Sequence, residues 1–381
     1  MRLALTIVIA LSTAASIWAQ DVESLPFHEY DPPSTLVVTE HPLTRAKYPF
    51  IDVHNHQFGM PDQDLSELTA EMDRLNMAVM VNLSGRGFRR VEQADGTTRY
   101  APRDGDYLRR AVTNASTNAP GRFIVFTNID LFGIDEPGWA ERTLRQLEAD
   151  VTNGANGLKI YKNLGLTTKD GQGERIPVND SRLDPIWAKC GELGIPVLIH
   201  TGEPAPFWMD KDGNNERLLE LIEKPERYRD PEIYPSWEEV MGEQHDIFRK
   251  HPRTNFINAH LGWMGNDLES LGALMDELPN MYTEIGAVLA ELGRQPRFAR
   301  EWLIRYQDRV MFGKDSWRPE EYHVYFRVLE TADDYFDYYR RRHAFWKMYG
   351  LDLPDDVLRK LYYKNALRVV PGIDPTLFPD G

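Results

Sequence analysis

The sequence is almost without cysteine, and this scarcity excludes two kinds of construction. Cys190 is the one thiol in 381 residues, so no intrachain disulfide can form and no zinc site can be built from several thiolates. There is also no internal repeat and no low-complexity tract. Beyond residue 19 no apolar run approaches the roughly 20 residues that a membrane span requires. We therefore expect a globular chain that is held together without covalent cross-links and that has no membrane partner once it is mature.

Positive charge is also in short supply. The chain has 44 Lys and Arg residues against 59 Asp and Glu residues, a formal net charge of -15. Nucleic acids and anionic membranes would repel such a chain, so a small molecule is the expected partner. Composition leaves open whether the chain forms a homo-oligomer.

The first residues are typical of a secretory signal. Arg2 precedes an apolar stretch, and the small residue Ala19 stands before the polar pair Gln20 and Asp21, which predicts cleavage after Ala19 and export to the periplasm or the outside of the cell. An uncleaved membrane anchor is the alternative, although the apolar stretch is short for a span.

The remaining chain divides by pattern into an arm, a domain and a tail. Residues 20–47 are rich in Pro, Ser and Thr and have no period, which predicts an extended arm. From 48 to 370, short apolar runs alternate with segments of helical period, as repeated βα units require. Residues 371–381 form the tail. Strands are expected at 50–54, 78–83, 123–128, 157–161, 196–200, 255–259, 282–285 and 310–312.

Eight strand-and-helix units predict an α/β fold, a closed (β/α)₈ TIM barrel whose active site lies at the carboxyl ends of the strands. An open, doubly wound sheet is the alternative. Residues 320–349 and 355–367 are expected to form helices that close over the barrel. Two long connections, 84–106 and 202–236, are candidate lids or substrate walls, although the first, which is rich in arginine, is equally consistent with a solvated surface loop.

The first strand carries the earliest chemical signal. His54 and His56 are two residues apart, and side chains at i and i+2 of a strand point to the same face. Their imidazoles can therefore meet at one point, where a metal ion would fit. Other polar residues recur at or near the ends of later strands, where a barrel would bring them to the same mouth: Lys159, His200, His260, Glu284 and Asp315.

This combination resembles the amidohydrolase superfamily, in particular the amidohydrolase-related (amidohydrolase 2) branch that contains metal-dependent hydrolases and decarboxylases. The segment Asp52-Val53-His54-Asn55-His56 is similar to the H-x-H motif of the first strand in that superfamily. His200, His260 and Asp315 are similar to its conserved positions on the fifth, sixth and eighth strands.

The resemblance implies a divalent metal held by His54, His56, His200 and Asp315. One zinc ion is expected, and manganese, iron or cobalt would also suit these nitrogen and oxygen ligands. Zinc lowers the pKa of bound water towards about 7 and so supplies hydroxide as the nucleophile. Asp315 is the candidate acceptor of the water's proton, and His260 is the candidate to polarise a substrate carbonyl or shuttle a proton.

Several further residues are candidates for binding substrate or a second metal. The resemblance leaves two roles for Lys159: a carboxylated lysine that bridges two metals, the less favoured reading, or a cation that holds a substrate carboxylate. Lys162 competes for either role. Aromatic and charged residues near the predicted mouth suit an aromatic or carboxylated substrate or merely cap the core: Glu203, Trp263, Trp317 and Arg318.

Three functions follow from this set of residues. The leading hypothesis is a metal-dependent hydrolase that uses metal-bound hydroxide on an amide, ester or lactone. A metal-dependent decarboxylase on the same barrel is the alternative, because it would share all the ligands. A barrel that binds metal without catalysis ranks lowest, since it would be expected to lack ligands and none is missing.

Overall fold

The computed structural model describes residues 25–26, 29–92, 98–103, 105–340, 342–343 and 346–379. The predicted signal segment 1–19 lies outside these residues. The chain divides into two units, 1–36 and 37–381. The described residues of the first unit form no strand and no α-helix. None of the helices in the described part of the chain is both long and apolar enough for a membrane span.

Eight parallel strands form the centre of the second unit, in the order β1-β2-β5-β6-β7-β8-β9-β10. The ring of strands is nearly closed, because the backbone N–H of Val53 donates to the carbonyl of Phe312 at 3.0 Å and so joins the first strand to the last. The predicted barrel is confirmed, and the doubly wound alternative is wrong. The strands are β1 Phe50–Asn55, β2 Met77–Asn82, β5 Phe123–Thr127, β6 Ala155–Ile160, β7 Val197–Ile199, β8 Phe256–Asn258, β9 Met281–Glu284 and β10 Val310–Met311.

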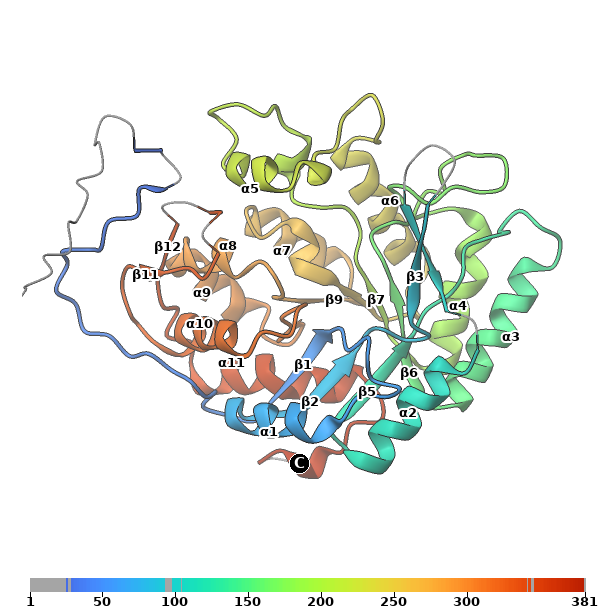
Figure 1. Ribbon diagram of the computed structural model, residues 1–381, viewed down its shortest axis with the longest axis horizontal. Coiled ribbons are helices and arrows are strands. Elements are labelled where there is room, and N and C mark those ends of the chain that lie inside the picture. The colour runs from blue at the N-terminus through green and yellow to red at the C-terminus, as the bar shows by residue number, and fades with distance from the viewer. Residues whose placement is uncertain are drawn as a thin grey trace, which may run out of the picture. The chain divides into compact units, whose positions relative to one another are not determined.

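Helices connect the strands and lie outside them, as α1, α2 and α3 do beside β1, β2 and β5 (Figure 1). Helix α1 buries residues at helical spacing, Leu65, Leu68, Met72 and Leu75, and Asp64 caps its first turn. The main helices are α1 Leu65–Leu75, α2 Tyr107–Asn118, α3 Trp139–Thr152, α4 Asp184–Leu193, α6 Trp237–Lys250, α7 Leu268–Glu277, α9 Pro296–Arg305 and α10 Pro319–Glu330. Short helices are α5 Leu218–Glu223, α8 Leu289–Gly293, α11 Asp355–Arg359 and α12 Asn365–Val369.

The C-terminal region differs from the sequence prediction in one place. A helix was expected from 320 to 349, but α10 ends at Glu330. The Thr331 hydroxyl donates to the Arg327 carbonyl at 2.8 Å and accepts from the Asp333 N–H at 3.2 Å. This side chain bonds the backbone in place of the next helical turn. The chain continues into the short antiparallel pair β11 Phe336–Asp337 and β12 Lys347–Met348.

The residues just before and just after the barrel in the sequence belong to the same unit as the barrel. The N–H groups of His41 and Lys47 donate to the carboxylates of Asp333 and Glu330, at 2.6 and 3.0 Å. At the other end, the ring of Phe378 stacks on that of Tyr363 at 4.9 Å. Both segments are therefore fastened to the barrel by specific contacts.

The seam between β1 and β10 should be a sensitive point of the core. The ring of Phe312 is fully buried and lies 4.8 Å from that of Phe50. Phe312→Ala should lower the free energy of unfolding by about 3–5 kcal/mol, because it removes contacts and leaves a cavity. Phe298→Ala, at a ring that is 45% exposed, should change it by less than about 0.5 kcal/mol. Equilibrium unfolding in guanidinium chloride measures both, and equal losses would contradict the assignment of the seam.

Candidate metal centre at the barrel mouth

The polar residues of the site stand at the carboxyl ends of their strands. His54 lies within β1, and His56 follows that strand by one residue. Because the strands are parallel, their carboxyl ends meet at one mouth. The other residues each end or follow a strand: His200 after β7, His260 after β8, Glu284 at the end of β9 and Asp315 after β10.

Three of the predicted ligands form a compact group. The ligand atoms of His54, His56 and Asp315 all lie within 4.8 Å of one another. An Asp315 carboxylate oxygen is 3.3 Å from His54 Nε2 and 3.6 Å from His56 Nε2. Around a tetrahedral zinc with bonds of 2.0–2.1 Å, ligand atoms are about 3.3 Å apart. The spacing of these atoms therefore suits a metal of that size.

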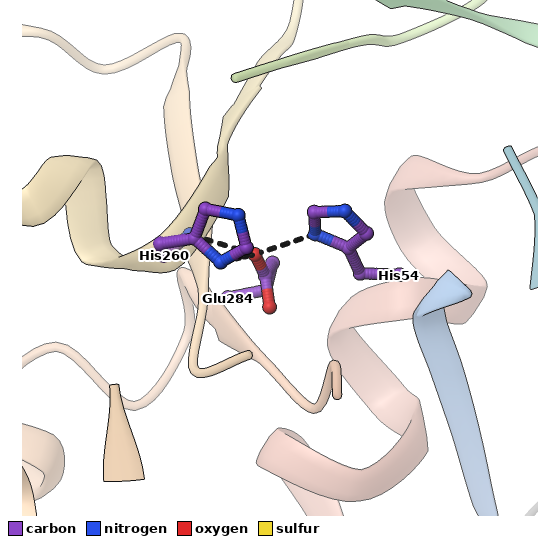
Figure 2. A group of neighbouring side chains, drawn as sticks. All are labelled: His54, His260 and Glu284. Carbon is purple, nitrogen blue, oxygen red and sulfur yellow. Dashed lines mark hydrogen bonds and ion pairs between the residues drawn. The ribbon is translucent and has the colours of Figure 1, made fainter. Parts of the chain in front are cut away.

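Glu284 fixes the tautomer of His54. Its carboxylate is fully buried, accepts a hydrogen bond from His54 Nδ1 at 2.9 Å and accepts the His260 N–H at 2.7 Å. Figure 2 shows the carboxylate between the two imidazoles. A carboxylate accepts, so His54 carries its proton on Nδ1, and Nε2 keeps a lone pair on the side of Asp315. A carboxylate behind a histidine in this way both orients the ring and strengthens it as a metal ligand.

A second chain of hydrogen bonds orients His260 and His200. His260 Nδ1 lies 2.7 Å from the Gly286 carbonyl, which can only accept, so this nitrogen carries the proton and Nε2 has the lone pair. That Nε2 is 3.3 Å from His200 Nδ1, which must then donate. His200 Nε2 is left with a lone pair. This atom is buried and has no hydrogen-bond partner among the described residues.

Burial keeps three of the imidazoles, those of His54, His56 and His200, neutral. It lowers the pKa of His56 to about 4, and it lowers those of His54 and His200 well below 6.5. Burial alone would raise the pKa of Asp315, but the neighbouring histidines and Lys159 hold it below its ordinary value. At neutral pH the site therefore presents imidazole lone pairs and one ionised carboxylate. This is the protonation state that a metal requires.

The chain leaves β8 through a left-handed turn. His260, Leu261 and Trp263 have φ values of 60°, 52° and 55°, a conformation that costs roughly 1–2 kcal/mol for each L-residue. Gly262 shares this turn, and a Cβ there would lie 2.4 Å from the amide of Asn258. Strain of this kind is concentrated at functional sites. Here the turn aims His260 at His200.

The two candidate lysines lie in different environments. Lys159 is fully buried, and its Nζ lies 3.5 Å from His54 Nε2. Burial lowers the pKa of Lys159 to about 8. Lys162 instead pairs with Glu203, which also accepts from Arg229 at 2.9 Å. Lys159 is thus the cation at the centre, whereas Lys162 and Glu203 form an ion pair.

The three remaining candidates, two tryptophans and one arginine, lie in different places. The ring of Trp263 lies 4.5 Å from that of His260 and 5.6 Å from that of His200, so it belongs to the site. Trp317 donates through Nε1 to Glu71 of α1 at 3.3 Å. The Arg318 side chain is 71% exposed beside Glu321. The structure therefore places Trp317 against the core, with its ring 5.6 Å from that of the buried Tyr322, and Arg318 at the surface, rather than with the histidines.

Sequence reasoning did not assign a role to Asp52. This buried carboxylate accepts the N–H groups of His54 and Lys314, at 3.0 and 3.1 Å, and the Tyr322 hydroxyl at 2.6 Å. It thereby ties the ligand strand β1 to the segment that carries Asp315. The available signal was a charged residue within an apolar strand, at the i−2 position from His54.

The chain belongs to the amidohydrolase family, whose model matches residues 51–372. The members of this family are enzymes that act on small molecules with a divalent metal. No protein of curated function matches the sequence.

Solved structures of the same fold include 2,6-dihydroxybenzoate decarboxylase from Rhizobium, at a TM-score of 0.51 and 13% identity over 84% of this chain and 98% of that one. A 4-oxalomesaconate hydratase from Rhodopseudomonas palustris has a TM-score of 0.48 at 16% identity over 84% and 95%. A dihydroxybenzoic acid decarboxylase from Polaromonas, with bound manganese, has a TM-score of 0.49 at 14% identity over 84% and 96%. Only the first of these has a TM-score above 0.5, and at 13% identity it supports the fold alone.

Removing the charge of Glu284 should weaken metal binding without removing a ligand. Glu284→Gln keeps the size of the side chain but loses the carboxylate behind His54, so metal affinity should fall about 10–100-fold. Competition with a chelator measures it. Glu269→Gln, at an exposed position of α7, is the matched control and should bind as the native protein does. An unchanged affinity of Glu284→Gln would show that this carboxylate does not support a ligand.

Metal retention should also extend to an unusually low pH. A protonated imidazole cannot bind a metal, and burial places the pKa of His56 at about 4 rather than 6.5. Because this pKa is lowered, the His56 imidazole stays neutral and able to bind the metal as the pH falls below 6.5. Metal content after dialysis should be constant down to about pH 5 and fall as the pH approaches 4. A release midpoint near 6.5 would contradict the burial argument.

Proposed function

We propose that the chain is a metal-dependent hydrolase that cleaves an amide, ester or lactone bond in a small substrate. The observation that carries the proposal is the grouping of His54, His56 and Asp315 within 4.8 Å. The unpartnered His200 Nε2 supports it, because a buried acceptor without a donor is costly unless a ligand completes it.

These four residues would hold one divalent metal, with zinc preferred and manganese, iron or cobalt compatible with the same ligands. When bound, the metal supplies a Lewis acid that polarises a carbonyl and makes water more acidic. A second metal bridged by a carboxylated Lys159 is a less favoured arrangement, because the amidohydrolase-related branch that the sequence resembles favours one metal.

Asp315 would be the general base. Its carboxylate is ionised and its side chain is 37% exposed, so water can reach it from the mouth. It would take a proton from the attacking water as the new carbon–oxygen bond forms. As the carbon–nitrogen or carbon–oxygen bond of the substrate breaks, that proton would pass to the leaving group, so that the charges balance.

His260 would assist at the proton-transfer step. The Gly286 carbonyl holds its proton on Nδ1, and Nε2 accepts from His200 Nδ1, so the ring presents no N–H to a substrate carbonyl. This tautomer favours a shuttle over a polarising donor. Trp263, which packs on the ring, would keep the imidazole in place.

A decarboxylase is the second candidate, and Lys159 favours it. This ammonium is fully buried, and no carboxylate accepts a hydrogen bond from it among the described residues. A buried cation of this kind would suit the carboxylate of a substrate. The two functions differ in product, since only one releases CO₂.

Substitution of Asp315 distinguishes the two proposed enzymes from a barrel that binds metal without catalysis. Asp315→Asn should lower the rate of hydrolysis about 10²–10⁴-fold, whereas Asp356→Asn, at a side chain that is 87% exposed, should not. The substrates are a panel of lactones, aryl esters, anilides and aryl carboxylates, with acid and CO₂ release both recorded. CO₂ release alone would support the decarboxylase. No turnover of any panel member by the metal-loaded protein would contradict both enzymes.

A further inference from the structure

The long connection after β2 contains a hairpin, β3 Phe88–Glu92 and β4 Thr98–Pro102. Alternate residues of a strand face the same side, so Phe88 and Arg90 point together while Arg89 points away. Tyr100 is paired directly opposite Arg90 and therefore shares its face. The hairpin thus presents two rings and a guanidinium on one side.

This face borders a cavity of about 350 Å³, which lies within the range of small-molecule sites. Four rings line it, together with two arginines: Phe58, Phe88, Tyr100, Tyr107, Arg90 and Arg103.

The walls of the cavity are fixed by contacts outside the hairpin. The Tyr107 hydroxyl donates to the Phe58 carbonyl at 2.6 Å, which joins the start of α2 to the loop after β1. Gly87 has a φ of 66°, and a Cβ there would lie 2.8 Å from the Tyr107 ring. A side chain at position 87 would therefore displace Tyr107, and the cavity depends on the glycine.

A single layer of rings separates the cavity from the metal centre. The Phe58 ring stacks on the imidazole of His56, with centroids 5.5 Å apart and planes 10° apart, and its edge meets Phe88 at 4.8 Å. Tyr161 contacts both His56 and Phe88, at 6.0 and 4.9 Å. A molecule in the cavity would thus lie against the same rings that pack on a metal ligand.

The arginines of the cavity have no carboxylate partner among the described residues. The guanidinium of Arg90 lies 6.0 Å from the Tyr100 ring, and Arg103 donates to the Phe88 carbonyl at 3.4 Å. Arg110 of α2, the helix that starts at Tyr107 beside the cavity, is by contrast paired with Asp62. In a chain of net charge -15, two guanidiniums that have no carboxylate partner in the described part of the chain and lie beside aromatic walls favour an anionic ligand.

We propose that this hairpin cavity is a binding subsite for a planar aromatic anion, the part of a substrate that lies remote from the reacting bond. The rings would stack on its faces and the two arginines would bind its carboxylate or other acidic group. The link to catalysis rests on the proposed function, whereas binding in the cavity does not. The subsite would select substrates that carry an acidic aryl group at one end.

The test uses 2-naphthoate as the probe and its neutral amide as the comparison, with calorimetry on the full chain. We expect 2-naphthoate to bind more tightly than the amide. The double variant Arg90→Gln/Arg103→Gln should weaken 2-naphthoate binding at least about tenfold and leave the amide unchanged. The matched control is Arg89→Gln, which removes the same charge from the opposite face of β3 and should bind within about twofold of the native protein.

Removal of the metal separates this subsite from the metal centre. Chelator-treated protein should bind 2-naphthoate as the untreated protein does, so a chain without metal or activity would still support the subsite. The proposal would be overturned if 2-naphthoate binding were lost on removal of the metal but unaffected in the double variant. Equal losses of affinity in Arg89→Gln and in the double variant would also overturn it, as would the absence of binding at millimolar 2-naphthoate. Thermal unfolding checks each variant, and Arg103→Gln alone replaces the double variant if that does not fold.

Discussion

The hydrogen bonds of the buried Glu284 carboxylate tie together three of the strand ends that form the mouth. This one group accepts from the imidazole of His54 and from the backbone of His260 and Gly286. The chain makes room for it with two glycines, since a Cβ at Gly286 or Gly313 would lie 2.6 or 2.3 Å from its oxygen. A carboxylate so deep in a barrel is costly unless every lone pair is used. The three hydrogen bonds that Glu284 accepts offset this cost, and they fix three strand ends at once.

The fold and the convergence of polar residues at the barrel mouth were readable from the sequence for one physical reason. Buried parallel strands are short apolar runs, and polar residues at their carboxyl ends converge wherever the barrel closes. His54, His200 and Asp315 each interrupt or end such a run. Glu284 does the same, yet its importance lies in what it bonds, which no spacing reveals. The spacing of His54 and His56 indicates that their side chains point to the same face, and closure of the barrel brings the other polar residues close to them.

Other features depended on side-chain geometry that no periodicity encodes. Lys159 and Lys162 are equivalent in the sequence, but only the first points into the barrel, while the second meets Glu203 across the mouth. Trp317 and Arg318 follow Asp315 closely in the sequence, yet Trp317 bonds Glu71 and Arg318 is exposed. The helix after Arg318 ends early because Thr331 bonds the backbone. At these positions the contacts of individual side chains, rather than the sequence pattern, determine the structure.

The proposed metal would be bound by the Nε2 atoms of His54 and His56 and by Asp315, with His200 Nε2 as the fourth ligand. Anomalous diffraction from crystals of the protein as purified, recorded at the absorption edge of the metal found, tests this directly. One strong peak is expected about 2.0–2.2 Å from the His54 and His56 nitrogens and from an Asp315 oxygen. A peak instead between His54 Nδ1, His260 and Glu284, the other group of potential ligands at this mouth, or no peak in metal-supplemented crystals, would contradict it.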